Sequence, residues 1–324
     1  MKEIEQILDL WAQLETVSEE AVLATVVKTR GSSYRLPGAR LLLARDGRRA
    51  GSVSGGCLEE DLVKRAWWLT ESGPVIRRYD TTPEGEIASK YGLGCHGVIH
   101  VRLERVTRDA PGILDLIRRV RSERRSEAVT HVIEGSETFG EVLSPPMHLL
   151  IFGAGDDAIA MLKLAKALGW RVSVFDGRAH YARREKFREA DCVTVCNPEN
   201  FRDVVPIDEW TAAILMTHSF SQDREFLRAL YTHRLPYLGV LGPRKRTDQL
   251  LAEAGIDPLN MNANFHAPMG LDIGADGPEQ VALSVIAEIQ AVLNAREGGF
   301  LSDRAGTIHS EEPEAAWVQS IVCA

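Results

Sequence analysis

The chain has 324 residues, of which 44% are hydrophobic and 26% charged, and its formal net charge is −8. This composition describes a globular protein long enough for two domains, and the negative charge argues against a nucleic-acid partner. No stretch approaches the ~20 apolar residues of a membrane span, and the first residues lack the pattern of a signal peptide. Five cysteines without a C-x-x-C pair favour free thiols. We therefore expect a cytoplasmic protein without a membrane partner.

The first part of the chain predicts a mixed domain of α+β type. Helical spacing of apolar residues and short β-branched runs predict helices at 4–14 and 58–69 and strands at 21–27, 40–44, 49–53, 75–79 and 98–103. Asp46-Gly47 is typical of a hairpin turn. Residues 118–125 are strongly basic and indicate a solvated helix face. Ser144-Pro145-Pro146 marks a boundary, because proline blocks both helix continuation and central-strand pairing.

After Pro146 the pattern changes to short apolar runs that alternate with helical segments. Strands are predicted at 147–152, 172–175, 192–196, 212–217 and 236–241, with a last helix at 279–296. Such alternation predicts a parallel sheet with crossover connections. The expected fold class is therefore α/β, in three parts. They are an N-terminal α+β domain at 1–144 with glycine–cysteine motifs, a Rossmann-like doubly wound parallel-sheet domain at 145–296, and a polar tail at 297–324.

A nucleotide-binding type of turn follows the first strand of the second half. Gly153, Gly155 and Ala158 take the three positions of a G-x-G-x-x-G/A fingerprint. Asp176 stands 21 residues after Gly155, where a carboxylate accepts hydrogen bonds from a ribose. Asp156-Asp157 oppose this interpretation, because two carboxylates at a helix N-terminus repel a phosphate. A bound NAD(P) and a Rossmann-like domain with an altered cleft both stay open.

Two N-terminal segments place a cysteine among glycines, at 51–57 and 91–97. Glycine lets the backbone approach a ligand closely, and the thiolate of cysteine is a nucleophile and a metal ligand. The candidate residues are Ser54, Gly55, Gly56, Cys57, Gly94, Cys95 and His96. The alternative for both cysteines is a small buried residue in a turn. Cys192 and Cys196 share one face of a predicted strand and favour core packing.

Further candidates are basic residues that can meet an anionic ligand. His218 follows the strand at 212–217, and ligands of open α/β sheets bind beyond such strand ends. Arg244, Lys245 and Arg246 follow the strand at 236–241 and can capture a phosphate, unless they form a basic surface loop. Arg40 is a basic candidate of the first half. The chain holds no H-E-x-x-H pattern, no G-x-S-x-G and no Walker A sequence.

Taken together, these motifs resemble the XdhC/CoxI family, the accessory factors of molybdenum hydroxylases. The resemblance covers nearly the whole chain. Its N-terminal marks are GSS at 31–33, PGAR at 37–40 and GSVSGGCLE at 51–59. Its C-terminal marks are GAG at 153–155, MTH at 216–218, GPRKR at 242–246 and PMGLDIGA at 268–275. We know no other family that has both sets.

The resemblance implies a maturation chaperone more than a catalyst. Family members bind molybdenum cofactor (molybdopterin, or its cytosine dinucleotide form) and protect it. They support its sulfuration and insert it into the large subunit of a hydroxylase of the xanthine dehydrogenase, aldehyde oxidase or CO dehydrogenase type. A cysteine desulfurase is the implied sulfur source, and a homodimer is the implied assembly. Cys57 is the implied contact to the cofactor, close to its molybdenum or its sulfur.

At two places the sequence departs from the family pattern, and this affects which residue roles can be carried over from the family to this chain. His96 stands between Cys95 and Gly97, where two glycines are usual, and Asp156-Asp157 replaces a common His-Val pair. The resulting hypothesis has glycine backbone approaching the pterin, Cys57 and Cys95 presenting sulfur, and the basic candidates neutralising a phosphate. Two other functions remain open: an NAD-dependent oxidoreductase that uses the Rossmann half, and a scaffold for hydroxylase and desulfurase that binds no cofactor.

Overall fold

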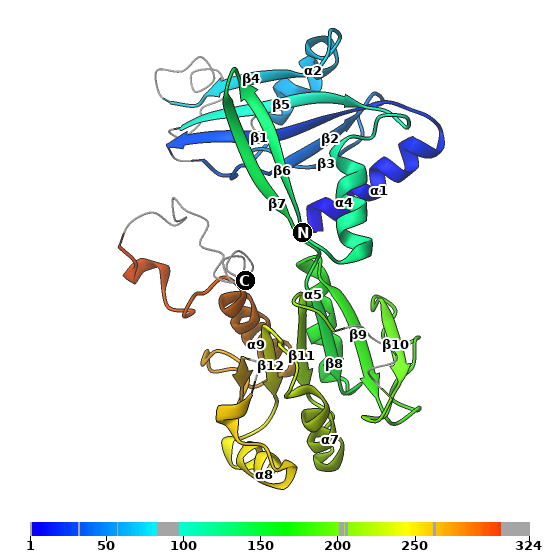
Figure 1. Cartoon of the computed structure of the whole chain (residues 1–324), viewed down its shortest axis with the longest axis vertical. Coiled ribbons are helices and arrows are strands. Elements are labelled where there is room, and N and C mark those ends of the chain that lie inside the picture. The colour runs from blue at the N-terminus through cyan, green and yellow to red at the C-terminus, as the bar shows by residue number, and fades with distance from the viewer. Residues whose placement is uncertain are drawn as a thin grey trace. The chain divides into compact units, whose positions relative to one another are not determined.

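The structure, a computed structural model, describes residues 2–31, 33–56, 58–82, 97–200, 204, 207–261 and 264–305 (Figure 1). Among the predicted site residues, Cys57, Gly94, Cys95 and His96 lie outside this described part. The chain divides into two compact units, Met1–Pro145 and Pro146–Ala324, and each unit is described by itself. None of the helices in the described ranges has both the length and the apolar character needed to cross a membrane.

Unit 1 is built on an antiparallel five-stranded sheet of order β3-β2-β1-β5-β4. Its elements are α1 (Lys2–Thr16), β1 (Ala21–Gly31), β2 (Arg40–Ala44), β3 (Arg49–Gly51), α2 (Glu59–Leu69), β4 (Val75–Asp80), β5 (Gly97–Val106), α4 (Ile113–Glu123), β6 (Glu127–Glu134) and β7 (Glu137–Leu143). Alternate residues of β1 face opposite sides. Leu23 packs with α1 and α4, whereas Val22 packs with α2.

The predicted helices and strands of unit 1 are all present, and β2 and β3 pair across the turn that contains Gly47. The pattern did not predict the β6–β7 hairpin, which forms a sheet of its own. Its strands carry few buried apolar residues, and the side chains of Val132 and Val142 are exposed. Burial in the ribbon does not follow residue type, since the polar His131 is buried and the apolar Val132 is exposed. The sequence therefore lacks the alternation of apolar and polar residues from which a strand is predicted.

Unit 2 is a parallel six-stranded sheet of order β10-β9-β8-β11-β12-β13. Its elements are β8 (His148–Phe152), α5 (Asp157–Ala167), β9 (Arg171–Asp176), β10 (Cys192–Val195), β11 (Thr211–Leu215), α7 (Phe220–Leu230), β12 (Tyr237–Val240), α8 (Arg244–Ala254), β13 (Phe265–His266) and α9 (Pro278–Leu293). Numbered within the unit, this is the Rossmann order 3-2-1-4-5-6. The predicted fold class is therefore confirmed.

Helices cover both faces of this sheet, as a doubly wound fold requires (Figure 1). α5 and α9 pack against each other over one face, and α7 and α8 bury their apolar residues on the other. The strands are short and buried, because both of their faces are covered. The two-residue β13 was not predicted, since so short a strand has no periodicity to detect.

The strand order reverses between β8 and β11, and this reversal defines the topological switch point. The turn after β8 lies directly against the chain that follows β11. Gly153 has a φ of +126°, and a Cβ on this residue would lie 2.3 Å from the carbonyl oxygen of Met216. Only glycine allows so close an approach with this backbone conformation. The fold therefore places two predicted motifs, GAG and MTH, side by side.

Candidate functional site

In unit 1, the glycine-rich loop that leads to α2 is organised around the Glu59 carboxylate. Oε1 accepts hydrogen bonds from the Val53 and Ser54 amides at 3.0 and 2.9 Å and from the Ser52 hydroxyl at 2.7 Å. Oε2 accepts from the Gly56 amide at 3.1 Å and from the Ser54 hydroxyl. The loop thus wraps around a side chain that is only 4% exposed.

This arrangement stabilises the charged form of Glu59. Burial raises the pKa of the carboxyl group, but the hydrogen bonds from the Ser54 and Ser52 hydroxyls lower it. The net pKa lies below the ordinary value of 4.5. The carboxylate therefore occupies a concavity of backbone N–H groups of the kind that binds anions.

The anchored loop leaves two glycines open to solvent. Gly55 and Gly56 are exposed, whereas Val53, Ser54 and Leu58 are buried. The Ser54 hydroxyl also accepts a hydrogen bond from the Leu58 amide at 3.1 Å, so the chain is fixed on both sides of position 57. Of the predicted site residues in this loop, Ser54 has its polar groups satisfied within the protein, and Gly55 and Gly56 offer accessible backbone.

Arg40, the basic candidate of unit 1, is buried in an ion pair. Its side chain is 3% exposed, and its guanidinium contacts Glu141 and donates to the Gly38 carbonyl at 2.8 Å. His131 Nε2 also lies 2.7 Å from Glu141. Burial raises the pKa of Glu141, but the His131 hydrogen bond and the Arg40 charge bring it below its ordinary value. The guanidinium is thus committed to a contact inside unit 1.

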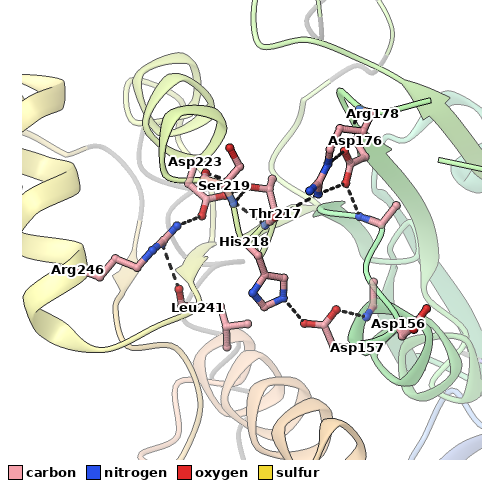
Figure 2. Close-up of polar contacts among 12 residues, drawn as sticks. Asp156, Asp157, Asp176, Arg178, Thr217, His218, Ser219, Asp223, Leu241 and Arg246 are labelled. Atoms are coloured by element: carbon pink, nitrogen blue, oxygen red, sulfur yellow. Dashed lines mark hydrogen bonds and ion pairs between the residues drawn. The ribbon is translucent and has the colours of Figure 1, made fainter. Parts of the chain in front are cut away.

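In unit 2, the switch point carries an exposed histidine paired with a carboxylate (Figure 2). His218 Nε2 lies 2.7 Å from Asp157 Oδ2, and the two side chains are 61% and 23% exposed. His218 has a φ of +58°, an unusual conformation for a residue other than glycine. Asp157 Oδ1 accepts a hydrogen bond from the Ala158 amide at 3.0 Å, in the first turn of α5.

A buried network fixes the backbone around His218 (Figure 2). Asp223 is 1% exposed and accepts hydrogen bonds from both the amide and the hydroxyl of Thr217. Its other oxygen pairs with Arg246 at 2.6 Å. The Thr217 hydroxyl in turn accepts from the Ser219 amide at 3.0 Å. Arg246, predicted to bind a phosphate, therefore serves this network.

Asp176, the predicted ribose acceptor, is fully buried and already saturated (Figure 2). Its Oδ2 accepts from the Ala154 amide at 2.9 Å, and Arg178 donates to both of its oxygens at 2.9 Å. Arg178 also donates to the Thr217 carbonyl and stacks over the Tyr181 ring. These contacts tie β9 to the turn after β8 and to the chain after β11.

Arg244 and Lys245 differ from Arg246. Both are exposed at the first turn of α8, and neither side chain has a hydrogen bond or an ion pair to another residue of the described ranges. They are available to an anion, and helix N-termini attract negative charge. A contact between these two side chains and a phosphate group stays a prediction from the sequence.

The cysteines of unit 2 occupy two different environments. Cys196 is 1% exposed and belongs to the core, as predicted, and burial raises the pKa of its thiol to about 11. The prediction of core packing is wrong for Cys192, which is only half-buried because β10 is an edge strand of the sheet. Neither thiol lies at the switch-point network.

The sequence did not identify Glu59, Asp223 or Glu141 as organising residues. A signal existed for Glu59, because carboxylates in the first turn of a helix meet free N–H groups. The arginine partners of Asp223 and Glu141 lie 23 and 101 residues away. A single sequence gives no means of pairing residues at such separations.

These features define the chain as a protein that joins an antiparallel α+β unit to a Rossmann unit whose switch point is cross-linked by ion pairs. The family model described as "XdhC Rossmann domain" matches residues 149–289. The model described as "XdhC and CoxI family" matches residues 16–80. The chain belongs to the XdhC and CoxI family.

Two relatives and one crystal structure are similar to this chain over most of their length. The chain is 32% identical to a Bacillus subtilis protein named as a probable xanthine dehydrogenase subunit, covering 84% of this chain and 92% of that protein. It is 28% identical to "Molybdenum cofactor insertion chaperone PaoD" of Escherichia coli, covering 84% and 83%. A crystal structure described as a xanthine dehydrogenase from Bacillus halodurans superposes with a TM-score of 0.79 at 28% identity, covering 94% and 98%.

Proposed function

We propose that the protein binds molybdenum cofactor, protects it, and inserts it into the large subunit of a molybdenum hydroxylase. Relatives that span most of the chain support this proposal, since one carries the name of a molybdenum cofactor insertion chaperone and another is named for xanthine dehydrogenase. We further propose that it supports sulfuration with sulfur from a cysteine desulfurase, and that it acts as a homodimer. The cofactor is cargo in this scheme, and no chemical turnover by the chain is required.

One structural observation carries the proposal, namely the loop that Glu59 holds in place. Five hydrogen bonds to one buried carboxylate fix residues 52–56, and the two exposed glycines directly precede Cys57 in sequence. A fixed backbone without side chains allows a flat ring system to approach closely. A thiolate sulfur is a ligand of the soft type that suits molybdenum and sulfur chemistry. We propose Gly55, Gly56 and Cys57 as the contacts, with Cys95 and its neighbours Gly94 and His96 as a second set.

The oxidoreductase alternative receives no support from the geometry of unit 2. A dinucleotide-dependent enzyme needs a free ribose acceptor at the end of β9. Asp176 has no exposed area and accepts hydrogen bonds from Ala154 and Arg178. The scaffold alternative makes a different prediction, since it requires no function of Cys57.

A maturation assay distinguishes these alternatives. Hydroxylase apoprotein is incubated anaerobically with cofactor and either the native chain or the Cys57→Ser variant, and hydroxylase activity is then measured. We expect the native chain to raise the activity and Cys57→Ser to lower this gain at least about tenfold, equivalent to about 1.4 kcal/mol. Cys192→Ser changes a half-buried thiol on the edge strand β10, and we expect it to behave as the native chain does.

Two outcomes would contradict the proposal. If the native chain gives no gain in hydroxylase activity, it is not a maturation factor for that enzyme. If Cys57→Ser matures the hydroxylase as well as the native chain, the thiol plays no part and a scaffold becomes the better description.

A further inference from the structure

The Rossmann fold of unit 2 implies a dinucleotide cofactor, but the residues at its switch point do not fit one. We infer that Asp157 acts as a built-in substitute for the pyrophosphate, so that unit 2 takes no dinucleotide. This inference concerns unit 2 alone and is independent of the proposed function. Three observations support it. The Asp157 carboxylate lies over Gly155, Ala154 and Arg178 use both oxygens of Asp176, and His218 holds the Asp157 side chain in place.

The space over Gly155 is filled by the Asp157 carboxylate. In the dinucleotide fingerprint, the second glycine lacks a side chain so that the pyrophosphate can reach the backbone there. In this protein, a Cβ on Gly155 would lie 2.4 Å from Asp157 Oδ1. The same oxygen accepts the hydrogen bond from the Ala158 amide at 3.0 Å, in the helix turn that a phosphate would otherwise contact.

The neighbouring Asp156 plays no such part. Its side chain is 94% exposed, and its carboxylate pairs with Lys186 at 2.8 Å. Lys186 also donates to the Ala154 carbonyl at 2.8 Å. The Asp157 carboxylate thus fills the space over Gly155, whereas the Asp156 side chain is exposed. The two residues therefore provide a matched comparison.

The ribose position is blocked as well. Asp176 offers no free oxygen to a ligand, because Ala154 and Arg178 use both oxygens and the residue has 0% exposed area. Binding of a ribose would require Arg178 to leave this carboxylate and the Thr217 carbonyl. The two contacts that define the fingerprint are therefore both made within the protein.

His218 holds Asp157 in this place (Figure 2). The imidazole contacts Oδ2 while the α5 amide contacts Oδ1, so each oxygen has a partner. A residue other than glycine in the left-handed region is strained and persists only where its surroundings fix it. The Thr217–Asp223–Arg246 network provides this constraint.

Titration calorimetry with NADH, NADPH and inorganic pyrophosphate tests the inference. We expect the native chain to bind none of the three more tightly than about 1 mM, a standard binding free energy near −4 kcal/mol. Asp157→Ala should bind pyrophosphate at least about tenfold more tightly, because it clears Gly155 and frees the Ala158 amide. Asp157→Ser also shortens the side chain but keeps a polar group in the first turn of α5, and it gives a second measurement if the alanine variant is unstable.

Two controls separate occupied space from charge. Asp157→Asn keeps the volume over Gly155 but loses the charge, and Asp156→Ala removes an equal charge that pairs with Lys186 and does not lie over Gly155. Both should bind pyrophosphate within about threefold of the native chain. The inference is overturned if the native chain binds NADH or NADPH at micromolar concentration, if neither short Asp157 variant gains affinity, or if either control gains as much as Asp157→Ala.

Discussion

Replacing Glu59 by alanine is expected to lower the free energy of unfolding of unit 1 by about 3–5 kcal/mol. The carboxylate accepts hydrogen bonds from three amides and two hydroxyl groups. Each buried donor that loses its acceptor costs about 1–3 kcal/mol, and water can reach only those near the exposed glycines. Urea denaturation followed by circular dichroism measures the loss.

Glu60→Ala is the matched control, because Glu60 is the next residue of α2 and is exposed. Its effect should stay within about 0.5 kcal/mol. Equal stability losses in the two variants would contradict the role assigned to Glu59.

The same carboxylate makes stability depend on pH in a defined direction. Its pKa in the folded protein is lower than its ordinary value of 4.5. Its contribution is therefore fully present above that value and is lost as the pH falls through the lower, folded-state pKa. Glu141 and Asp176 follow the same rule, so the comparison between the native chain and Glu59→Gln isolates the share of Glu59. The variant should lose less stability than the native chain between pH 7 and pH 3.

Gly153→Ala is expected to destabilise unit 2 by about 4 kcal/mol, since backbone strain and steric overpacking each cost about 1–3 kcal/mol. The added Cβ would lie 2.3 Å from the Met216 carbonyl oxygen, and backbone atoms cannot move aside as a flexible side chain can. The turn after β8 and the chain after β11 would have to separate, and the His218–Asp157 pair would be disturbed with them.

Gly73→Ala provides the control for the strain alone. Gly73 has a φ of +120°, close to the +126° of Gly153, but a Cβ there meets nothing within 4 Å. Urea denaturation of both variants, with each unfolding transition fitted separately, gives the comparison. A loss for Gly153→Ala no larger than that for Gly73→Ala would contradict the close packing of the two motifs.

The fold of unit 2 could be predicted because its signals are local. Short buried runs alternate with helical segments, and the glycines of the turn after β8 fix where the first crossover begins. Asp176 was correctly placed near the glycine turn, at the end of β9. Its state could not be predicted, because Arg178 decides whether the carboxylate is free, and only the structure shows the guanidinium folded back onto it.

The site was harder to predict because isolated charges look alike in a sequence. Arg40, Arg244 and Arg246 were equivalent candidates for a phosphate. In the structure, Arg40 forms an ion pair with Glu141 and Arg246 forms one with Asp223, whereas Arg244 is exposed. Each pair contains a buried charge, Arg40 in the first and Asp223 in the second, and an unpaired buried charge costs several kcal/mol. The partners come from distant strands and helices, and topology brings them together.

We propose that the loop held by Glu59 presents Cys57 to molybdenum cofactor. This role is measured by an anaerobic titration of purified cofactor into the native chain, followed by pterin fluorescence, with Cys57→Ala and Glu60→Ala alongside. We expect saturable binding by the native chain and by Glu60→Ala, and at least about tenfold weaker binding by Cys57→Ala. Absence of binding by the native chain, or equal affinity of the native chain and Cys57→Ala, would contradict it.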